Sequence, residues 1–356
     1  IGALASKPVM EGKAVLFKKF AGVDVFDIEI NEKDPQKLVE VIAALEPTFG
    51  AINIEDIKAP DCFNVERELS KRLNLPVFQD DKPGNAITVA AAMVNALTVA
   101  GKKIEEVKLV ASGAGAAALA CLNLLLVLGL KRENVFVTDL AGVVYEGRAE
   151  LMDEDKALFA QKTELRTLAQ VIEGADVFLG LSAGNVLKKE MVATMAAKPI
   201  IFALANPTPE ILPEDVKAVR SDAIIATGRT DYPNQVNNVL CFPYIFRGAL
   251  DCGATTITKE MEVAAVHAIA DLAKAEQSEE VAAAYIGHTL SFGPEYLIPK
   301  PFDPRLMLIV APAVAPAAAE CGVAQPPIAD MAAYREQLTT FVYASGTMMK
   351  PIVMAA

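Results

Sequence analysis

Histidine and cysteine are both scarce in this sequence. It contains 2 histidines and 5 cysteines in 356 residues, and no two cysteines form a C-x-x-C pair. With so little histidine, neither a Ser–His nucleophile nor a His-rich metal site is expected. Scattered cysteines are typical of buried thiols in a reducing compartment, so we expect neither a disulfide framework nor a zinc site.

The sequence also lacks long basic and long apolar runs. The formal net charge is −12, so we expect neither nucleic acid nor an acidic membrane surface as a partner. No uninterrupted apolar run approaches the roughly 20 residues of a membrane span, and no secretory pattern opens the chain. We therefore expect a cytoplasmic protein. The chain begins at Ile1 without methionine, which is typical of a fragment or a processed product.

A glycine- and alanine-rich turn is the strongest pattern present. Residues 109–112 predict a buried strand, residues 116–128 an apolar helix, and residues 135–137 a second strand that leads to Asp139. The turn between the first strand and the helix has G-x-G-x-x-A spacing and consists of Gly113, Ala114, Gly115, Ala116, Ala117 and Ala118. This arrangement predicts that backbone N–H groups at a helix N-terminus bind a dinucleotide pyrophosphate. The alternative is an alanine-rich helix packed tightly on a sheet.

Strands alternate with helices along most of the chain. Further strands are predicted at residues 23–30, 49–54, 75–78, 176–180, 199–205 and 223–226. Helices are predicted between them, including residues 10–20, 63–73 and 85–100, and a helix interrupted by Pro243 follows the last strand. A helix at residues 306–321 is expected to break or kink at Pro312 and Pro316. This order predicts an α/β protein with a doubly wound, Rossmann-like parallel sheet.

Two predicted strands end in adjacent acids about 25 residues apart. Glu55 and Asp56 follow one strand, and Asp80 and Asp81 follow the next. The carboxyl ends of such strands face the ligand crevice, and four carboxylates repel one another unless a cation lies between them. Hard oxygen ligands of this kind suit Mg²⁺ or Mn²⁺. The alternative is two independent surface turns.

Other polar residues are more ambiguous. Asn234, Asn237 and Asn238 cluster beyond the last predicted strand, which favours ligand contact over the local turn bonds that asparagine often makes. Lys13 lies near Lys18 and Lys19 in the first predicted helix, where a solvated helix face is the simplest interpretation.

Several motifs together resemble bacterial malic enzymes. They are KPVMEGKAVLFKKFAG, INIEDIKAP, SGAGAAALA, FALANPTPE, ATGRTDYPNQVNN and IPKPFDPRL. The nearest type is the two-part protein in which a malic enzyme half precedes a phosphotransacetylase-like half. The resemblance runs from residue 1 to about residue 351 and implies oxidative decarboxylation of L-malate with NADP or NAD and Mg²⁺ or Mn²⁺.

The resemblance also implies roles for individual residues. Lys13 matches the general base, Glu55, Asp56 and Asp81 match the metal ligands, and Asn206 with Asn238 or Asn237 match positions that hold substrate and nicotinamide. It implies a truncated N-terminal substrate and metal domain at residues 1–80. A dinucleotide-binding domain at 81–315 and a C-terminal helical segment at 316–356 follow. Members of this family are usually dimers or larger homo-oligomers.

The sequence departs from the family pattern at two places. The expected general-acid tyrosine belongs to a segment before Ile1, and the first tyrosine here is Tyr145. Residues 79–86 read QDDKPGNA where the family reads HDDQHGTA, so Lys82 replaces a glutamine. These departures favour a catalytically impaired nucleotide-binding homologue as the alternative, and a dehydrogenase with another substrate as a third interpretation. Asp139 favours NAD, whereas the resemblance favours NADP.

Overall fold

The computed structural model describes residues 2–58, 61–276 and 290–355, and the side chains up to residue 343. Contacts divide the chain into two compact units. The terminal unit comprises Ile1–Gly84, Asn238–Leu272 and Pro301–Ala356, and the sheet unit comprises Asn85–Asn237 and Ala273–Lys300. This grouping is discontinuous in sequence.

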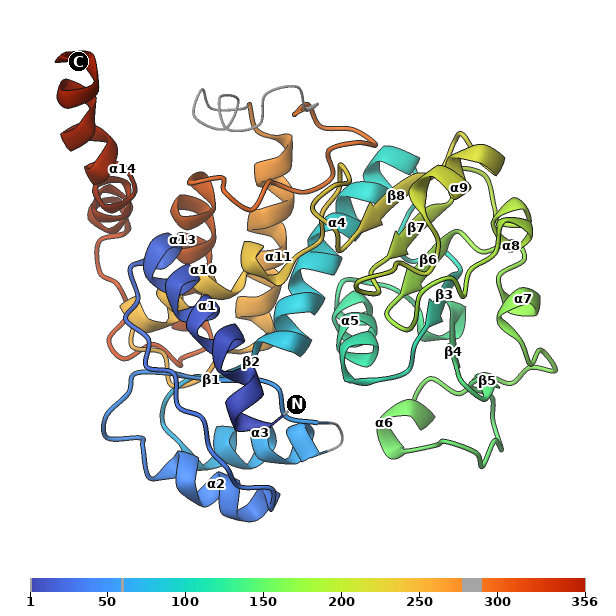
Figure 1. Ribbon diagram of the computed structural model, residues 1–356, viewed down its shortest axis with the longest axis horizontal. Helices are drawn as coiled ribbons and strands as arrows, with labels where there is room; N and C mark the ends of the chain where they lie inside the picture. The colour runs from blue at the N-terminus through green and yellow to red at the C-terminus, as the bar shows by residue number, and fades with distance from the viewer. Residues whose placement is uncertain (1, 59–60, 277–289, 356) are drawn as a thin grey trace. The chain divides into compact units, whose positions relative to one another are not determined.

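The sheet unit is built on six strands (Figure 1). Their order across the sheet is β5-β4-β3-β6-β7-β8, and all neighbours are parallel except β5 and β4. The strands are β3 (Leu109–Ser112), β4 (Val135–Asp139), β5 (Gly142–Val143), β6 (Val177–Gly180), β7 (Ile200–Ala203) and β8 (Ile224–Thr227). The first strand of this sheet, β3, therefore lies in its middle, and β3 and β6 lie at the point where the strand order reverses. Ligands bind at this point in doubly wound folds.

Apolar helices cover the sheet. Its helices are α4 (Asn85–Ala100), α5 (Ala116–Val127), α6 (Glu154–Ala157), α7 (Leu168–Val171), α8 (Lys189–Ala193) and α9 (Pro213–Val219), with a short turn η2 at Arg132–Asn134. A core cluster joins buried strand residues such as Phe178 and Ile201 to Val171, Val192 and Val216 of helices α7, α8 and α9. The predicted doubly wound sheet is confirmed.

The terminal unit contains a smaller sheet and most of the long helices. Its elements are α1 (Ala3–Ala21), α2 (Pro35–Ala43), β1 (Ile52–Ile54), α3 (Asp61–Arg72), β2 (Val77–Gln79), η1 (Asp80–Gly84), η3 (Asn238–Leu240), α10 (Phe242–Asp251), α11 (Lys259–Lys274), α13 (Arg305–Glu320) and α14 (Met331–Ala355). β1 and β2 are parallel, and residues of α2 and α3 form a core cluster with them. Helix α10 packs against α1 and α13.

Aromatic side chains fill the centre of this unit. The ring centroids of Phe17 and Phe242 lie 4.9 Å apart, and those of Phe78 and Phe246 lie 5.5 Å apart. Such tilted and edge contacts add to the hydrophobic stabilisation that ring burial provides. They join α1 and β2 to α10.

Four expectations about secondary structure were wrong or incomplete. Residues 23–30 alternate apolar and acidic but form no strand, and Phe26 remains 72% exposed. Pro243 does not interrupt a helix, because it lies in the first turn of α10, where its missing N–H is not needed. The prolines at 312 and 316 lie inside one continuous helix, α13. The short antiparallel β5 and helix α9 had not been predicted.

One long helical stretch has the length and composition of a membrane span. Residues Asp80–Ala100 meet that criterion within the described residues, and 72% of the apolar window is buried inside the structure. A core helix passes the same test.

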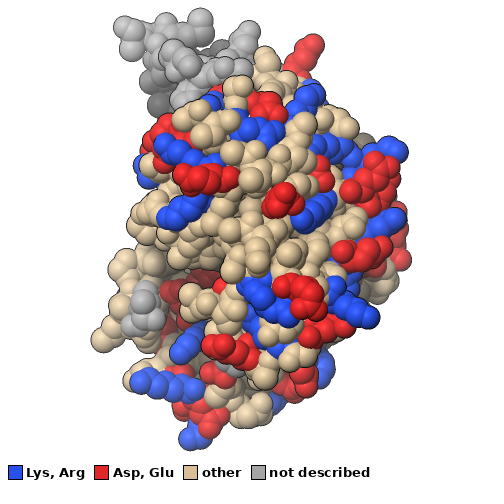
Figure 2. Space-filling model, turned by 90° about the vertical axis from the view of Figure 1, so that its right-hand side faces the viewer, with Lys and Arg blue, Asp and Glu red and all other residues tan. Residues whose placement is uncertain are grey.

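Figure 2 shows basic and acidic side chains interspersed over the face in view, without a large field of one sign.

Candidate functional site

The predicted phosphate-binding turn has the required local geometry. Gly113 has φ +110°, and a Cβ at this position would lie 2.4 Å from the carbonyl oxygen of Leu181. Only glycine fits such a close backbone approach. Gly115 is the N-cap of α5, and no atom comes within 4 Å of a Cβ built there. The space beside the N-cap of α5 is therefore open. The first N–H groups of a helix have no partner within the helix, so they can bind a phosphate there.

Asp139 lies at the end of β4, as expected, but its carboxylate already has two basic partners. Arg148 binds it with two hydrogen bonds of 2.9 and 2.5 Å, and Lys156 Nζ lies 2.9 Å from Oδ2. Partial burial alone would raise the pKa of Asp139, but the hydrogen bonds from Arg148 and Lys156 outweigh it, and the pKa is lowered. Neither basic residue had been singled out from the sequence.

The loop after β7 carries Asn206 at the same edge of the sheet. The Asn206 side chain is exposed and lies against Gly228, where a Cβ would be 3.0 Å from Nδ2. Asn237 is the last residue of this unit's main segment. The third asparagine of the cluster, Asn234, has a structural role. It donates to the carbonyls of Ile225 and Pro294 at 2.9 and 2.7 Å and accepts from the Leu297 N–H at 2.9 Å.

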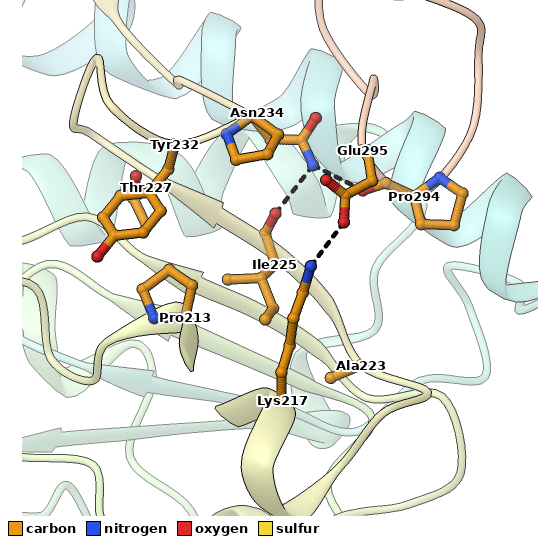
Figure 3. A pocket seen from close by; sticks show the side chains of 10 residues that line it. Pro213, Lys217, Ala223, Ile225, Thr227, Tyr232, Asn234, Pro294 and Glu295 are labelled. Atoms are coloured by element: carbon orange, nitrogen blue, oxygen red, sulfur yellow. Dashed lines mark hydrogen bonds and ion pairs between the residues drawn. The ribbon is translucent and has the colours of Figure 1, made fainter. Parts of the chain in front are cut away.

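A pocket beside Asn234 is too small for a dinucleotide. Figure 3 shows its lining, in which the ammonium of Lys217 lies 2.6 Å from the Glu295 carboxylate. Its volume is about 30 Å³, which is room for a single water molecule. We assign no ligand to it.

The terminal unit brings four polar side chains together around Lys13. The Lys13 ammonium donates to Glu55 Oε2 at 2.7 Å and to Asp80 Oδ2 at 2.6 Å. Asn238 Nδ2 donates to the same Asp80 oxygen at 2.6 Å, and Asn53 Nδ2 donates to Glu55 Oε2 at 3.0 Å. We call these five residues the lysine cluster. Lys13 is thus no solvated surface lysine, because two elements far apart in sequence supply its partners.

Burial determines the charge balance of this cluster. The pKa of Glu55 is raised to about 7 and that of Asp80 to about 6, in both cases chiefly because burial disfavours the ionised form. Repulsion from Asp81 raises both pKa values further, although Lys13 lowers them. Burial would also lower the pKa of Lys13, but the carboxylates of Asp80 and Glu55 outweigh it, so this pKa is raised.

The predicted metal ligands are only partly assembled. Asp81 acts electrostatically on Glu55 and Asp80, whereas Asp56 is exposed at φ +55°. No three His, Cys, Asp or Glu side chains among the described residues stand close enough together to hold a metal ion. The donor chemistry nevertheless fits a hard divalent cation, because Asp81 repels both Glu55 and Asp80 and the buried Asp80 Oδ1 has no hydrogen-bond partner.

Lys82 points away from the lysine cluster. Its ammonium lies 2.9 Å from Glu66 Oε2 and 4.0 Å from the ring centroid of Phe63, both on α3. The departure from the family glutamine therefore places a partly buried ion pair between the η1 turn and α3. A Cβ on Gly84, at the end of that turn, would lie 2.0 Å from Asp80 Oδ1, so glycine is needed there.

Asp80, which the resemblance does not include among the metal ligands, is the most buried member of the cluster. Asn53 was missed, although it lies on β1 two residues before Glu55, a spacing that places both side chains on one side of an extended chain. Glu210 was also missed. It is fully buried beside the phosphate turn, and nothing in its local sequence indicates this burial.

Two known protein families match consecutive parts of the chain. Residues 83–285 match the family described as "Malic enzyme, NAD binding domain", and residues 1–70 match "Malic enzyme, N-terminal domain". The chain is 65% identical over 356 residues to an NAD-dependent malic enzyme of Rhizobium meliloti, covering 100% of the chain and 46% of the relative. It is 63% identical over 357 residues to an NADP-dependent malic enzyme of Haemophilus influenzae, covering 100% and 47%.

A solved structure is also similar over nearly the whole chain. The malic enzyme of Pyrococcus horikoshii superimposes with a TM-score of 0.88 at 39% sequence identity, covering 99% of this chain and 80% of that one. The chain spans about half the length of the two bacterial relatives.

Proposed function

The chain belongs to the malic enzyme family, and we propose that it catalyses the oxidative decarboxylation of L-malate to pyruvate and CO₂ with reduction of NADP. The observation that carries this proposal is the lysine cluster. A lysine held by two buried carboxylates, beside a third carboxylate and an asparagine, has the groups needed to bind a 2-hydroxy acid and move its hydroxyl proton.

Lys13 is the proposed general base. Its raised pKa keeps the ammonium protonated beside these carboxylates, so it must lose that proton before it can accept one. Asp80 Oδ2 and Glu55 Oε2, at 2.6 and 2.7 Å, are the acceptors in contact with it. The neutral amine then accepts the proton of the malate hydroxyl as hydride leaves the carbon that carries this hydroxyl. Asn238 Nδ2 donates to the same oxygen at 2.6 Å and helps to keep Oδ2 directed at Lys13.

Glu55, Asp56 and Asp81 would hold a divalent cation. A bound Mg²⁺ or Mn²⁺ would polarise the substrate hydroxyl and stabilise negative charge that develops on oxygen. The support for this part is the donor chemistry of the cluster and the buried Asp80 oxygen without a partner.

The nicotinamide cofactor belongs to the sheet unit. A nicotinamide dinucleotide supplies the hydride acceptor, and the turn from Gly113 to Ala118 would bind its pyrophosphate. Arg148 and Lys156 together carry two positive charges, and Asp139 carries one negative charge. The excess positive charge favours binding of the extra phosphate of NADP over the free ribose hydroxyl of NAD.

Enzyme activity is tested on the protein expressed from its full reading frame. L-malate, Mn²⁺ and either NADP or NAD are added, and absorbance of the reduced cofactor is followed. Production of pyruvate and reduced cofactor in equal amounts supports the proposal. A protein that binds cofactor but oxidises L-malate with neither NADP nor NAD would instead be the nucleotide-binding homologue. A protein that oxidises other 2-hydroxy acids but not L-malate would be a different dehydrogenase.

Cofactor choice is tested separately with Lys156→Gln. Removing one of the two cations should weaken NADPH binding about tenfold relative to NADH, because a charge-assisted contact is lost. Affinities are measured by fluorescence of the reduced nicotinamide, with Lys162→Gln, an exposed lysine on the segment after α6, as a control. Equal weakening of both cofactors would contradict the assignment of NADP.

We also propose that the protein is a homo-oligomer. Leu4 and Val15 of α1 and nearby Phe26 are 90%, 63% and 72% exposed, and large apolar side chains of this kind often lie at subunit interfaces. Light scattering of the purified protein measures the mass. A monomer at all concentrations would contradict this.

A further inference from the structure

Glu210 is a fully buried carboxylate without a basic partner. It lies on the loop after β7, is 0% exposed, and forms no ion pair with any described lysine or arginine. Its Oε1 accepts hydrogen bonds from the Ser182 N–H at 2.9 Å and from Ser182 Oγ at 3.3 Å. Its Oε2 accepts from the Ala205 N–H at 3.0 Å. Burying a carboxylate in this way is costly, so a simple loop-closing role does not explain it well.

One oxygen of Glu210 is connected to the phosphate turn. Ser182 Oγ lies 2.9 Å from Ser112 Oγ, and Ser112 is the last residue of β3, directly before Gly113. The residue before Ser182, Leu181, supplies the carbonyl that lies 2.4 Å from the Cβ position of Gly113. Fixing Ser182 therefore fixes the surface against which the turn packs.

The other oxygen is connected to Asn206. Glu210 Oε2 accepts a hydrogen bond from the N–H of Ala205, and Ala205 directly precedes Asn206. The loops after β6 and β7 are also joined by backbone bonds, from Asn185 N–H to Pro209 O and from Leu187 N–H to Glu210 O, both of 3.0 Å. A Cβ on Gly180 would lie 2.4 Å from Glu210 Cδ, so the end of β6 leaves just enough room for the carboxylate.

We propose that Glu210 is a positioning residue for the dinucleotide. Its two oxygens hold the phosphate turn and the Asn206 loop in a single relative geometry, so the carboxylate sets cofactor affinity without touching the cofactor. This inference rests on the proposed function, in which the sheet unit binds NADP or NAD.

The hydrogen-bond pattern distinguishes a carboxylate from its amide. Three donors on two sides require two acceptor oxygens, and glutamine has only one, with an NH₂ group that would face a backbone N–H. Aspartate keeps both acceptors but is shorter by one methylene. Glu210→Gln therefore preserves the size of the side chain but loses one of its two hydrogen-bond acceptors. Glu210→Asp keeps both acceptor oxygens, but its shorter side chain brings them less close to the donors.

The experiment measures binding of NADPH and NADH to the full protein without malate or metal. Fluorescence of the reduced nicotinamide gives the dissociation constants, and thermal unfolding is followed in parallel. Glu262→Gln is the matched control, because Glu262 is 5% exposed, has a raised pKa from burial like Glu210, and lies on α11 in the terminal unit.

We expect Glu210→Gln to raise both dissociation constants about tenfold, because hydrogen bonds to a charged group are lost. Glu210→Asp should recover part of this affinity, Ser182→Ala should lose about two- to threefold, and Glu262→Gln should bind like the wild type. In turnover assays, KM for the cofactor should rise more than kcat falls, because a saturating cofactor compensates for weakened binding.

Three results would overturn the inference. The first is wild-type affinity in Glu210→Gln, and the second is equal losses in Glu210→Gln and Glu262→Gln. The third is a poorly folded Glu210→Gln accompanied by wild-type affinity in both Glu210→Asp and Ser182→Ala. A wild-type protein that binds neither dinucleotide would overturn the proposed function itself, and this inference with it.

Discussion

The two units bury carboxylates in opposite ways. In the lysine cluster, Glu55 and Asp80 share the ammonium of Lys13, and asparagine side chains complete the hydrogen bonding. In the sheet unit, Glu210 is held by backbone N–H groups and a hydroxyl, and no lysine or arginine that the structure describes pairs with it. The first arrangement can move a proton, because both partners titrate. The second can only hold position, because backbone N–H groups do not exchange charge with the carboxylate.

The largest effect is expected when the titrating arrangement is broken. Lys13→Met should lower turnover about 10²- to 10⁴-fold, because the proposed base is removed and Glu55 and Asp80 lose their shared cation. Initial rates with saturating malate and cofactor measure this. Lys7→Met is the control, since Lys7 is also on α1 but forms exposed ion pairs, and it should keep wild-type turnover. Full activity in Lys13→Met would show that the base lies elsewhere.

A smaller effect is expected when the backbone-built arrangement is distorted. Gly113→Ala should weaken cofactor binding about tenfold or more, because its Cβ would meet the Leu181 carbonyl at 2.4 Å and its φ of +110° is unfavourable for alanine. Gly101→Ala is the control, because Gly101 has φ +72° but nothing within 4 Å of its Cβ. Similar losses of stability in both variants, with cofactor affinity lost only in Gly113→Ala, would support the phosphate-turn assignment. Unchanged affinity in Gly113→Ala would exclude it.

The smallest effect concerns stability as a function of pH. The pKa values of Asp80 and Glu55 are raised to about 6 and about 7, so the folded state retains protons that the unfolded carboxylates have already lost. The free energy of unfolding should therefore fall as pH rises from about 4 to 7. Asp80→Asn removes one of these groups, and its stability relative to the wild type should improve across that range. Urea unfolding at intervals of one pH unit measures both curves, and parallel curves would contradict the raised pKa of Asp80.

Local patterns in the sequence predicted the sheet unit closely. The G-x-G-x-x-A spacing, the apolar helix after it and the acid after the second strand all occupy their predicted places, because each depends on neighbours within about 30 residues. The same local reasoning failed at residues 23–30, where alternation suggested a strand. A strand also needs a partner, and pairing is a tertiary property.

The lysine cluster could be predicted only in part. Family motifs pointed to Lys13, Glu55 and Asn238, and the pairs of adjacent acids included Asp80. The contact of Asp80 with Lys13 and the role of Asn53 were not predicted. The same holds for Arg148 and Lys156, whose pairing with Asp139 changed the interpretation of that acid. Ion pairs between residues far apart in sequence depend on which elements the fold brings together.

By itself, the sequence determined the order of strands and helices, the glycine turn and the family, because these rest on local periodicity and on motifs of fixed spacing. Only the tertiary structure decided that Lys13 lies between two buried carboxylates, that Asp139 is already paired, and that Glu210 is buried beside the phosphate turn. The physical reason is that burial and charge pairing depend on what surrounds a side chain in three dimensions, and those surroundings come from segments up to about 200 residues away along the chain.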